Sequence, residues 1–143
     1  MQASRKLERD LRDALANDEF ELHYQPLYSL KKELVCGFEA LLRWQPPEGG
    51  LVSPAEFIPL LEESGLIVPV GEWVIDAACA QIRQWQEAGI KPVPVAVNIS
   101  GRQFQQHELD KTIAQILSKN RLDARWLEVE ITESSLMEKP DEA

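Results

Sequence analysis

The chain has 143 residues, which fits one domain or part of one. Its 24 acidic against 15 basic residues give a net charge of −9, which argues against non-specific nucleic-acid binding and against docking on an anionic membrane. No apolar run approaches the length of a membrane span, and no signal-peptide pattern opens the chain. We therefore expect a cytoplasmic protein, although other domains of a parent protein could anchor it to a membrane. The two cysteines lack C-x-x-C spacing and are expected to be reduced thiols.

An N-terminal helix is predicted over residues 4–17, because leucines recur there at four-residue intervals and Asn17-Asp18 mark a stop. The leucines are Leu7, Leu11 and Leu15. Such a charged helix suits a linker between domains. We therefore assign residues 1–18 to a linker-like helix and residues 19–143 to the domain that follows it.

A β-hairpin is predicted next. Residues 20–28 alternate with period two, although Pro26 places the end of this strand at an edge or a bend. A polar turn at residues 31–33 leads to a second strand over residues 34–44. The short connection predicts that the two strands are antiparallel neighbours.

Helices and strands then alternate. Ser53 and Pro54 are typical of a helix start, and Ser64-Gly65 of its end. A longer helix should run to about Ala88, with Gly89 as its stop, before a short strand over residues 93–99.

The last third of the chain continues this alternation. Ser100 precedes a helical stretch that ends at Asn120, and Leu127 to Thr132 form a fourth strand. Residues 134–137 resemble the start of another helix. This order, after the opening hairpin, predicts an α/β architecture with parallel strands.

The second strand carries an acid and a base in an otherwise apolar segment. Side chains alternate along a strand, so Glu39, Leu41 and Arg43 share one face, while the other face holds Phe38, Ala40, Leu42 and Trp44. Desolvating a carboxylate and a guanidinium is costly unless both are used. The pair suits a metal ligand beside an anion clamp.

Polar residues also end the two later strands. Asn98 closes residues 93–98, and Glu130 lies within residues 127–132. Ligands gather at the carboxyl ends of parallel strands, so Glu39, Asn98 and Glu130 are expected to converge. Two carboxylates and an amide oxygen suit Mg²⁺, Mn²⁺ or Ca²⁺ rather than zinc.

Each of these residues also has a simpler interpretation. Glu39 could pair structurally with Arg43, Asn98 could begin the turn into the next helix, and Glu130 could belong to a solvent-facing polar stripe. His23 and His107 are interpreted as surface or packing residues. The four tryptophans are interpreted as core and interface residues. The residues taken one by one leave the site assignments open.

Five motifs in order resemble the EAL domain family, the phosphodiesterases and sensors of cyclic di-GMP. The motifs are residues 20–27 (FELHYQPL), residues 37–44 (GFEALLRW, which holds the name-giving triplet), residues 53–60 (SPAEFIPL), residues 95–100 (VAVNIS) and residues 127–134 (LEVEITES). The resemblance implies the N-terminal half of a modified TIM (β/α)8 barrel whose first strand is antiparallel. It implies a parent activity that hydrolyses cyclic di-GMP to linear pGpG by two-metal catalysis with Mg²⁺ or Mn²⁺.

The resemblance also implies roles for individual residues. One catalytic metal would be held by Glu39, Asn98 and Glu130. The ligand would be contacted by Gln25, Leu42 and Arg43, with Arg43 on a phosphate. Glu133 would help to order a catalytic loop.

The family's later half supplies an Asp-Asp pair, a lysine, a glutamate and a glutamine-bearing loop, none of which can be placed in this sequence. We therefore expect these 143 residues to be inactive alone, with metal bound weakly or not at all. We expect them to self-associate as a homo-oligomer or to pair with the C-terminal half of the domain. The alternative function is a non-catalytic module of a bacterial signalling protein that binds cyclic di-GMP or another protein.

Overall fold

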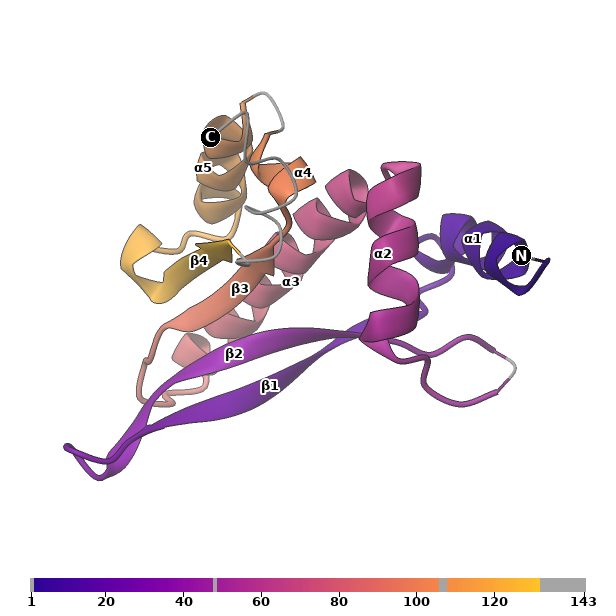
Figure 1. Ribbon diagram of the computed structural model, residues 1–143. Helices are drawn as coiled ribbons and strands as arrows, with labels where there is room; N and C mark the ends of the chain where they lie inside the picture. Colours follow the sequence, from indigo (N-terminus) through magenta and orange to yellow (C-terminus); the bar gives the residue numbers. More distant parts are fainter. Residues whose placement is uncertain (1, 48, 106–107, 132–143) are drawn as a thin grey trace, which may run out of the picture.

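The computed structural model describes residues 2–47, 49–105 and 108–131 (Figure 1). The elements are α1 (Gln2–Ala14), β1 (Phe20–Ser29), β2 (Leu34–Trp44), α2 (Pro54–Ser64), α3 (Ile67–Glu87), β3 (Val95–Ile99), α4 (Gly101–Phe104), α5 (Leu109–Lys119), a 3-10 turn (Ala124–Trp126) and β4 (Leu127–Ile131). The predicted alternation of helices and strands is confirmed.

The strands form one sheet in the order β1-β2-β3-β4. β1 and β2 are antiparallel, as predicted, with a register shift between Leu27 and Tyr28 just after Pro26. β3 is parallel to β2, and β4 is parallel to β3. A sheet with one antiparallel first strand followed by parallel crossovers is consistent with the predicted part of a barrel.

The two faces of the sheet differ in cover. α3 lies behind β3 in Figure 1, and Val95, Val97 and Ile99 of β3 are fully buried beneath it, while α2 packs at one end of β2. The predicted division of β2 is confirmed, because Ala40 and Trp44 are buried on the helix side. Alternate residues of the same strands point to the other face, which carries the polar candidates.

An aromatic cluster closes the helix-covered face at one end of the hairpin. Trp44 has no exposed surface, and its ring lies 5.8 Å from Phe57 and 6.4 Å from Phe20, measured between centroids. Its indole Nε1 donates a hydrogen bond to the Glu19 carboxylate at 3.0 Å. The tryptophan is thus a core residue with a satisfied polar atom, as the sequence predicted.

Two ionisable groups lie in the same covered layer. Burial, with a smaller contribution from Cys79, raises the pKa of Tyr24 to about 12, and burial followed by the charge of Asp76 raises the pKa of Cys79 to about 11. Both side chains are therefore neutral at pH 7. Both cysteines are free, as expected, with Cys36 at the surface.

The N-terminal helix packs on the body of the molecule. Leu11 and Ala14 of α1 are buried, and α1 contacts α2. α1 ends at Ala14 rather than at residue 17, because residues 15–18 form a turn in which Asp18 adopts a positive φ of 54°.

Two polar contacts join α3 to the end of α5. Lys119 Nζ and Asn120 Nδ2 donate to the Asp76 carboxylate at 3.0 and 2.9 Å. Burial by itself would raise the pKa of Asp76, but the hydrogen bonds from Asn120 and Lys119 outweigh it, and the pKa is lowered.

Three predicted boundaries differ from the structure. The stretch after Ser100 forms two helices, α4 and α5, with Glu108 at a positive φ of 67° before the second. β3 begins at Val95 rather than at residue 93, since Pro94 has no N–H and its carbonyl instead accepts from Phe38 N–H at 3.0 Å. Thr132 and the helix start predicted at residues 134–137 lie outside the described residues.

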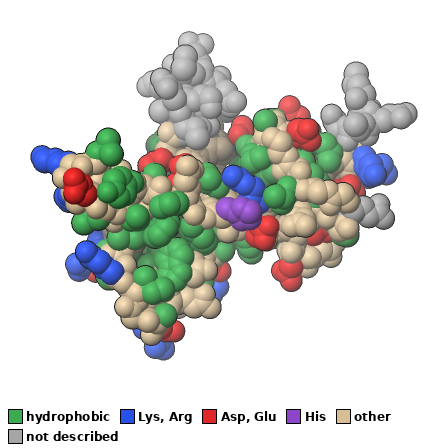
Figure 2. Space-filling model, turned by 90° about the horizontal axis from the view of Figure 1, so that it is seen from below, with side chains coloured by type: hydrophobic (Ala, Val, Ile, Leu, Met, Phe, Trp, Pro, Cys, Tyr) green, Lys and Arg blue, Asp and Glu red, His purple; other side chains and the backbone are tan. Residues whose placement is uncertain are grey.

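The hairpin end away from the helices exposes apolar side chains. These are Leu27, Tyr28, Leu30, Leu34 and Val35. Figure 2 shows hydrophobic side chains gathered toward the hairpin end of the molecule and bordered by Lys and Arg side chains. Of the helices in the described segments, none alone has the length and apolarity to cross a membrane, and α2 with α3 meets that test only as a pair bent by 120°.

Candidate functional site

A cavity of about 470 Å³ opens at the carboxyl ends of β2 and β3. α2, α3 and α4 form its other walls. Four of the candidates from the sequence line it: Glu39, Leu42, Arg43 and Asn98. The location is the one expected for a ligand site in a parallel α/β fold.

Glu39 and Asn98 meet across the β2–β3 pair. Asn98 Nδ2 donates to Glu39 Oε2 at 3.0 Å, although the two residues are 59 positions apart in the chain. Glu39 pairs in register with Ala96 of β3. Asn98 follows Ala96 by two residues and therefore lies on the same face of the sheet. The predicted convergence of these two residues is therefore seen in the structure.

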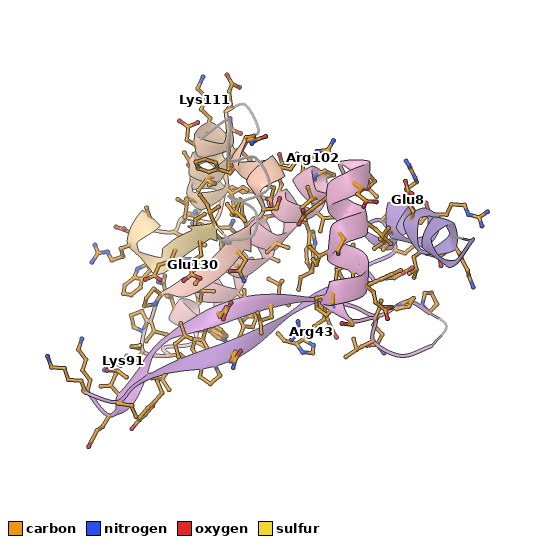
Figure 3. All side chains as sticks on the ribbon, in the orientation of Figure 1. Glu8, Arg43, Lys91, Arg102, Lys111 and Glu130 are labelled. Carbon is orange, nitrogen blue, oxygen red and sulfur yellow. The ribbon has the colours of Figure 1, made fainter. Side chains whose placement is uncertain are left out.

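Glu130 extends this row to a third strand. It is the register partner of Asn98 in the parallel β3–β4 pair, so both side chains lie on one face of the sheet. Neighbouring strands of a sheet lie about 4.8 Å apart. Glu130 is exposed and does not line the cavity. Figure 3 shows it on β4, with Arg43 at the end of β2 near the base of α2.

Arg43 is half-buried, and its Nη1 donates to the carbonyl of Leu42 at 3.0 Å. In the described part of the chain it forms no ion pair with Glu39. The structural Glu39–Arg43 pair that the sequence left open is thus not formed. The guanidinium keeps most of its donors for a bound anion.

Gln25 lies directly opposite Glu39 in the antiparallel pair and is exposed on the same face. Leu42 lies on the helix-covered side of β2, between Ala40 and Trp44, and reaches the cavity from there. Glu133 falls outside the described residues. His23 is exposed and contacts Glu21 at 3.1 Å, which supports its interpretation as a surface residue.

The turn after β3 is capped by Ser100 rather than by Asn98. Ser100 Oγ accepts from Gln103 N–H at 3.2 Å, and the Gln103 side chain accepts in return from Ser100 N–H. Ser100, two positions after Asn98, therefore fills the turn role that was the alternative interpretation of Asn98. The sequence analysis missed Gln103, although serine and glutamine three positions apart are a capping-box signal.

The donor set fits a hard divalent cation. Glu39 and Glu130 offer carboxylate oxygens, and Asn98 offers an amide oxygen. In the structure the amide nitrogen of Asn98 faces Glu39, so a shared cation would replace this hydrogen bond and require the amide to turn. No group of three His, Cys, Asp or Glu side chains converges within the described ranges, which agrees with a site of only two acids.

Residues 8–143 match the sequence model of the EAL domain. The chain belongs to the EAL domain family. The resemblance inferred from the five motifs is confirmed. The family match begins inside α1, within the helix that was assigned to a linker.

Curated bacterial EAL relatives are much longer than this chain. It is 49% identical over 128 residues to the signaling protein YkoW of Bacillus subtilis, covering 90% of this chain and 16% of that protein. It is 45% identical over 132 residues to the cyclic di-GMP phosphodiesterase PdeR of Escherichia coli, covering 92% of this chain and 20% of the relative. The chain thus spans a fifth or less of the length of these relatives.

Solved EAL structures share the fold. The PaMucR phosphodiesterase in complex with c-di-GMP superposes with a TM-score of 0.88 at 42% identity, over 96% of this chain and 56% of that chain. The FimX EAL domain from Pseudomonas aeruginosa bound to c-di-GMP gives 0.80 at 28% identity, over 96% and 54%. The described elements therefore correspond to about half of an EAL domain structure.

Proposed function

We propose that this chain supplies the first metal and phosphate contacts of a cyclic di-GMP phosphodiesterase of the EAL family. The observation that carries the proposal is the Glu39–Asn98 contact at 3.0 Å, formed across two strands at the wall of a cavity that also holds Arg43. PdeR, 45% identical to the chain, is a cyclic di-GMP phosphodiesterase. The MucR phosphodiesterase, 42% identical, is solved in complex with c-di-GMP.

Glu39, Asn98 and Glu130 would hold one Mg²⁺ or Mn²⁺ ion, because three oxygen donors lie on one face of adjacent strands. When bound, such an ion offsets phosphate charge and lowers the pKa of water. Three protein donors leave several coordination positions to water or ligand, so we expect weak binding by these residues alone.

Arg43, Gln25 and Leu42 would contact the ligand. Cyclic di-GMP carries two phosphodiester charges, and the chain has a net charge of −9, so binding needs a local positive group. Arg43 lines the cavity and is free of an acidic partner in the described residues. Gln25 lies on the same face as Glu39 and can reach a ligand that spans the hairpin.

The site is tested in a chimera in which this chain replaces the matching part of the MucR phosphodiesterase. We expect the chimera to convert cyclic di-GMP to the linear dinucleotide with Mn²⁺. Single alanine variants of Glu39, Asn98 and Glu130 should each lower turnover by about 10²–10³-fold, as removal of one preorganised electrostatic contact does. His23→Ala is the control, because His23 shares the face but pairs with Glu21. Wild-type turnover in Glu39→Ala would disprove the metal assignment.

Arg43 is tested in the same chimera by measuring binding and turnover together. Arg43→Ala should raise the dissociation constant for cyclic di-GMP and lower turnover, since it removes charge-assisted contacts. Arg43→Lys should restore only part of the affinity, because lysine cannot bind in a bidentate manner. Unchanged affinity in Arg43→Ala would rule out the phosphate contact.

The second candidate is a binding module without turnover. It is favoured by the orientation of the Asn98 amide, whose nitrogen rather than its oxygen faces the Glu39 carboxylate. Calorimetry of the 143-residue chain with cyclic di-GMP, in EDTA and in Mn²⁺, separates the two. Equal affinity in both, without linear product, supports the module. Metal-dependent affinity supports the metal site. Turnover by this chain alone would overturn our expectation that it is inactive in isolation.

A further inference from the structure

Gly71 leaves a gap in α3 that a side chain of α4 fills. Its backbone is helical, so no unusual φ explains a glycine that weakens a helix relative to alanine. A Cβ atom at this position would lie 1.7 Å from Gln103 Nε2 and 2.2 Å from Gln103 Cδ. An alanine at this position would therefore require the Gln103 side chain to move, because the Gln103 amide rests directly on the backbone of α3.

Gln103 is 2% exposed and makes two contacts with Ser100. Its side-chain oxygen accepts from Ser100 N–H at 3.4 Å, and its own N–H donates to Ser100 Oγ at 3.2 Å. Ser100 stands two residues after Asn98, and Ile99 between them is buried. The Gln103 side chain thus fixes the backbone that leaves β3 immediately after the candidate metal ligand.

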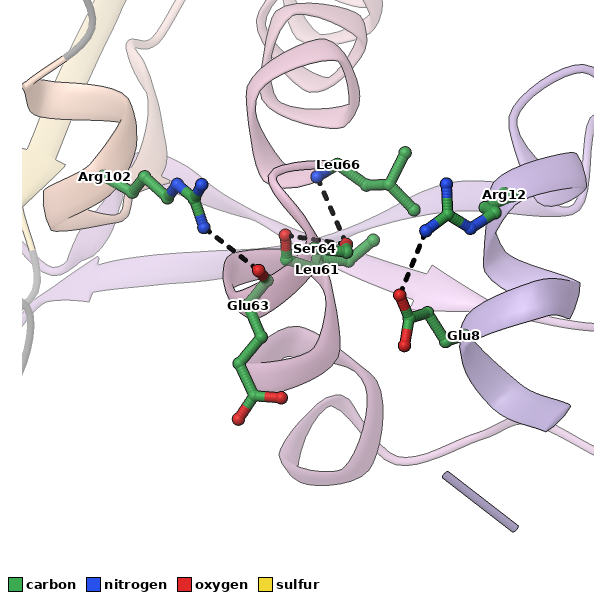
Figure 4. Close-up of polar contacts among 7 residues, drawn as sticks. All are labelled: Glu8, Arg12, Leu61, Glu63, Ser64, Leu66 and Arg102. Carbon is green, nitrogen blue, oxygen red and sulfur yellow. Dashed lines mark hydrogen bonds and ion pairs between the residues drawn. The ribbon is translucent and has the colours of Figure 1, made fainter. Parts of the chain in front are cut away.

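The neighbouring Arg102 attaches the same short helix to α2. Its Nη1 donates to the backbone carbonyl of Glu62. It also donates to the carbonyl of Glu63 at 3.3 Å, where α2 ends (Figure 4). The guanidinium also passes 3.5 Å from the position of a Cβ on Gly65, which has a φ of +84°. α4 has only four residues, yet it is held by both helices that wall the cavity.

We propose that Gln103 is a positioning residue for Asn98. Seated on Gly71, it holds the turn after β3 so that the Asn98 amide stays within hydrogen-bond distance of Glu39. The importance of Asn98 for metal binding rests on the proposed function, whereas its positioning does not. A side chain with this role should be coupled to Gly71, and loss of the coupling should move Asn98 although neither residue touches it.

The test is NMR of the 143-residue chain, read at the side-chain NH₂ group of Asn98. Gly71→Ala drives Gln103 out and should shift the Asn98 signals and speed their hydrogen exchange about tenfold. Gln103→Ala should do the same more weakly, because it removes the cap without a clash. The double variant should lie closer to wild type than Gly71→Ala alone, since the added methyl group then occupies the space left by Gln103.

Two controls make the result specific. Ala80→Gly lies on the exposed side of α3 and changes helix stability without touching α4, so Asn98 signals should stay in place. Glu39→Gln marks the shift that results from altering the partner of Asn98. If Gly71→Ala does not fold, Gln103→Ala and the double variant still test the coupling. Unmoved Asn98 signals in Gln103→Ala, or a double variant worse than Gly71→Ala, would overturn the proposal.

Metal affinity distinguishes this proposal from the proposed function. In the chimera with the MucR remainder, Gln103→Ala should weaken Mn²⁺ binding, measured by electron paramagnetic resonance, about 10–100-fold, as expected for a residue that orients a ligand. If Mn²⁺ does not bind the unsubstituted chimera, the metal site fails while the NMR result still decides the role of Gln103. Equal Mn²⁺ affinity in the chimera and in its Gln103→Ala variant, with wild-type binding present, would count against positioning.

Discussion

The two faces of the sheet are built from the same strands, but one is buried beneath helices and the other carries polar side chains of the candidate site. On β3, Ile99 is 1% exposed beneath α3, while the preceding Asn98 is exposed and bonds to Glu39. On β2, Trp44 is enclosed by aromatic rings, while the preceding Arg43 lines the cavity. At these two places strand alternation therefore sets a residue that holds the fold beside a residue that can bind. Of two substitutions at adjacent positions, one should mainly lower the free energy of unfolding and the other should mainly impair binding or turnover.

The sharpest contrast is expected between Trp44 and Arg43. Trp44→Ala should lower the free energy of unfolding by about 3–5 kcal/mol, because it empties the centre of the Phe20–Phe57 cluster and leaves Glu19 without its indole donor. Arg43→Ala should cost about 1 kcal/mol or less, since it loses one bond to a backbone carbonyl. Urea unfolding measures both. A loss of equal size in both variants would show that the two faces are equally structural.

A second contrast lies on β3. Ile99→Ala should destabilise the chain by about 2–5 kcal/mol through loss of buried volume against α3. Asn98→Ala removes one exposed hydrogen bond to Glu39 and should cost about 1 kcal/mol or less. Thermal unfolding of the two variants at one pH compares them. If Asn98→Ala proved the more damaging, the Asn98–Glu39 contact would be a structural element.

The open sheet edge gives a smaller, concentration-dependent effect. In the described part of the chain β4 has one strand neighbour, and Val129 on it is 41% exposed. We expect the chain to self-associate through such edges, and Val129→Lys should raise the protein concentration at which light scattering detects dimers. Asp10→Asn, an exposed position on α1, makes the same change in net charge and should not. A monomer at all concentrations would refute the association.

The weakest effect concerns the helix layer. The folded pKa of Asp76 is lowered, so its contribution to stability is present above the unfolded value of about 3.9 and is lost as pH falls through the folded pKa. Asp76→Asn should cost about 0.5–1 kcal/mol at pH 7, because the contacts with Lys119 and Asn120 are partly exposed. The difference from wild type should shrink as the pH falls through the folded pKa in acid titrations of unfolding. A difference that grows on acidification would reverse the sign assigned to this group.

The division of buried and polar residues between the two faces of the sheet was largely predictable from local sequence. Alternation placed Glu39 and Arg43 opposite Ala40 and Trp44, and the hairpin connection set the antiparallel pairing, because both signals depend on neighbouring residues. The family motifs also identified Asn98 and Glu130 before their register pairing was known. Site roles of these residues remain predictions.

Other features were not readable from periodicity. The break between α4 and α5 occurs at Glu108, whose positive φ no local signal required. In the described residues Glu39 bonds to Asn98 of β3 rather than to Arg43 of its own strand. Asn98 is 59 positions away in the chain, so no local signal could identify it as the partner. The Gly71–Gln103 contact likewise joins two elements whose approach is decided by packing. Long-range packing, rather than propensity, sets these details.

The 59-residue separation of Glu39 and Asn98 also has a consequence for the order of folding. β1 and β2 are joined by a short turn and can pair early, whereas β2 and β3 pair only after α2 and α3 have crossed over the sheet. Closing that longer connection costs more conformational entropy than closing the hairpin turn. We therefore expect the Glu39–Asn98 contact to form after the hairpin, so that a ligand held by both residues binds only chains in which α2 and α3 have connected β2 to β3.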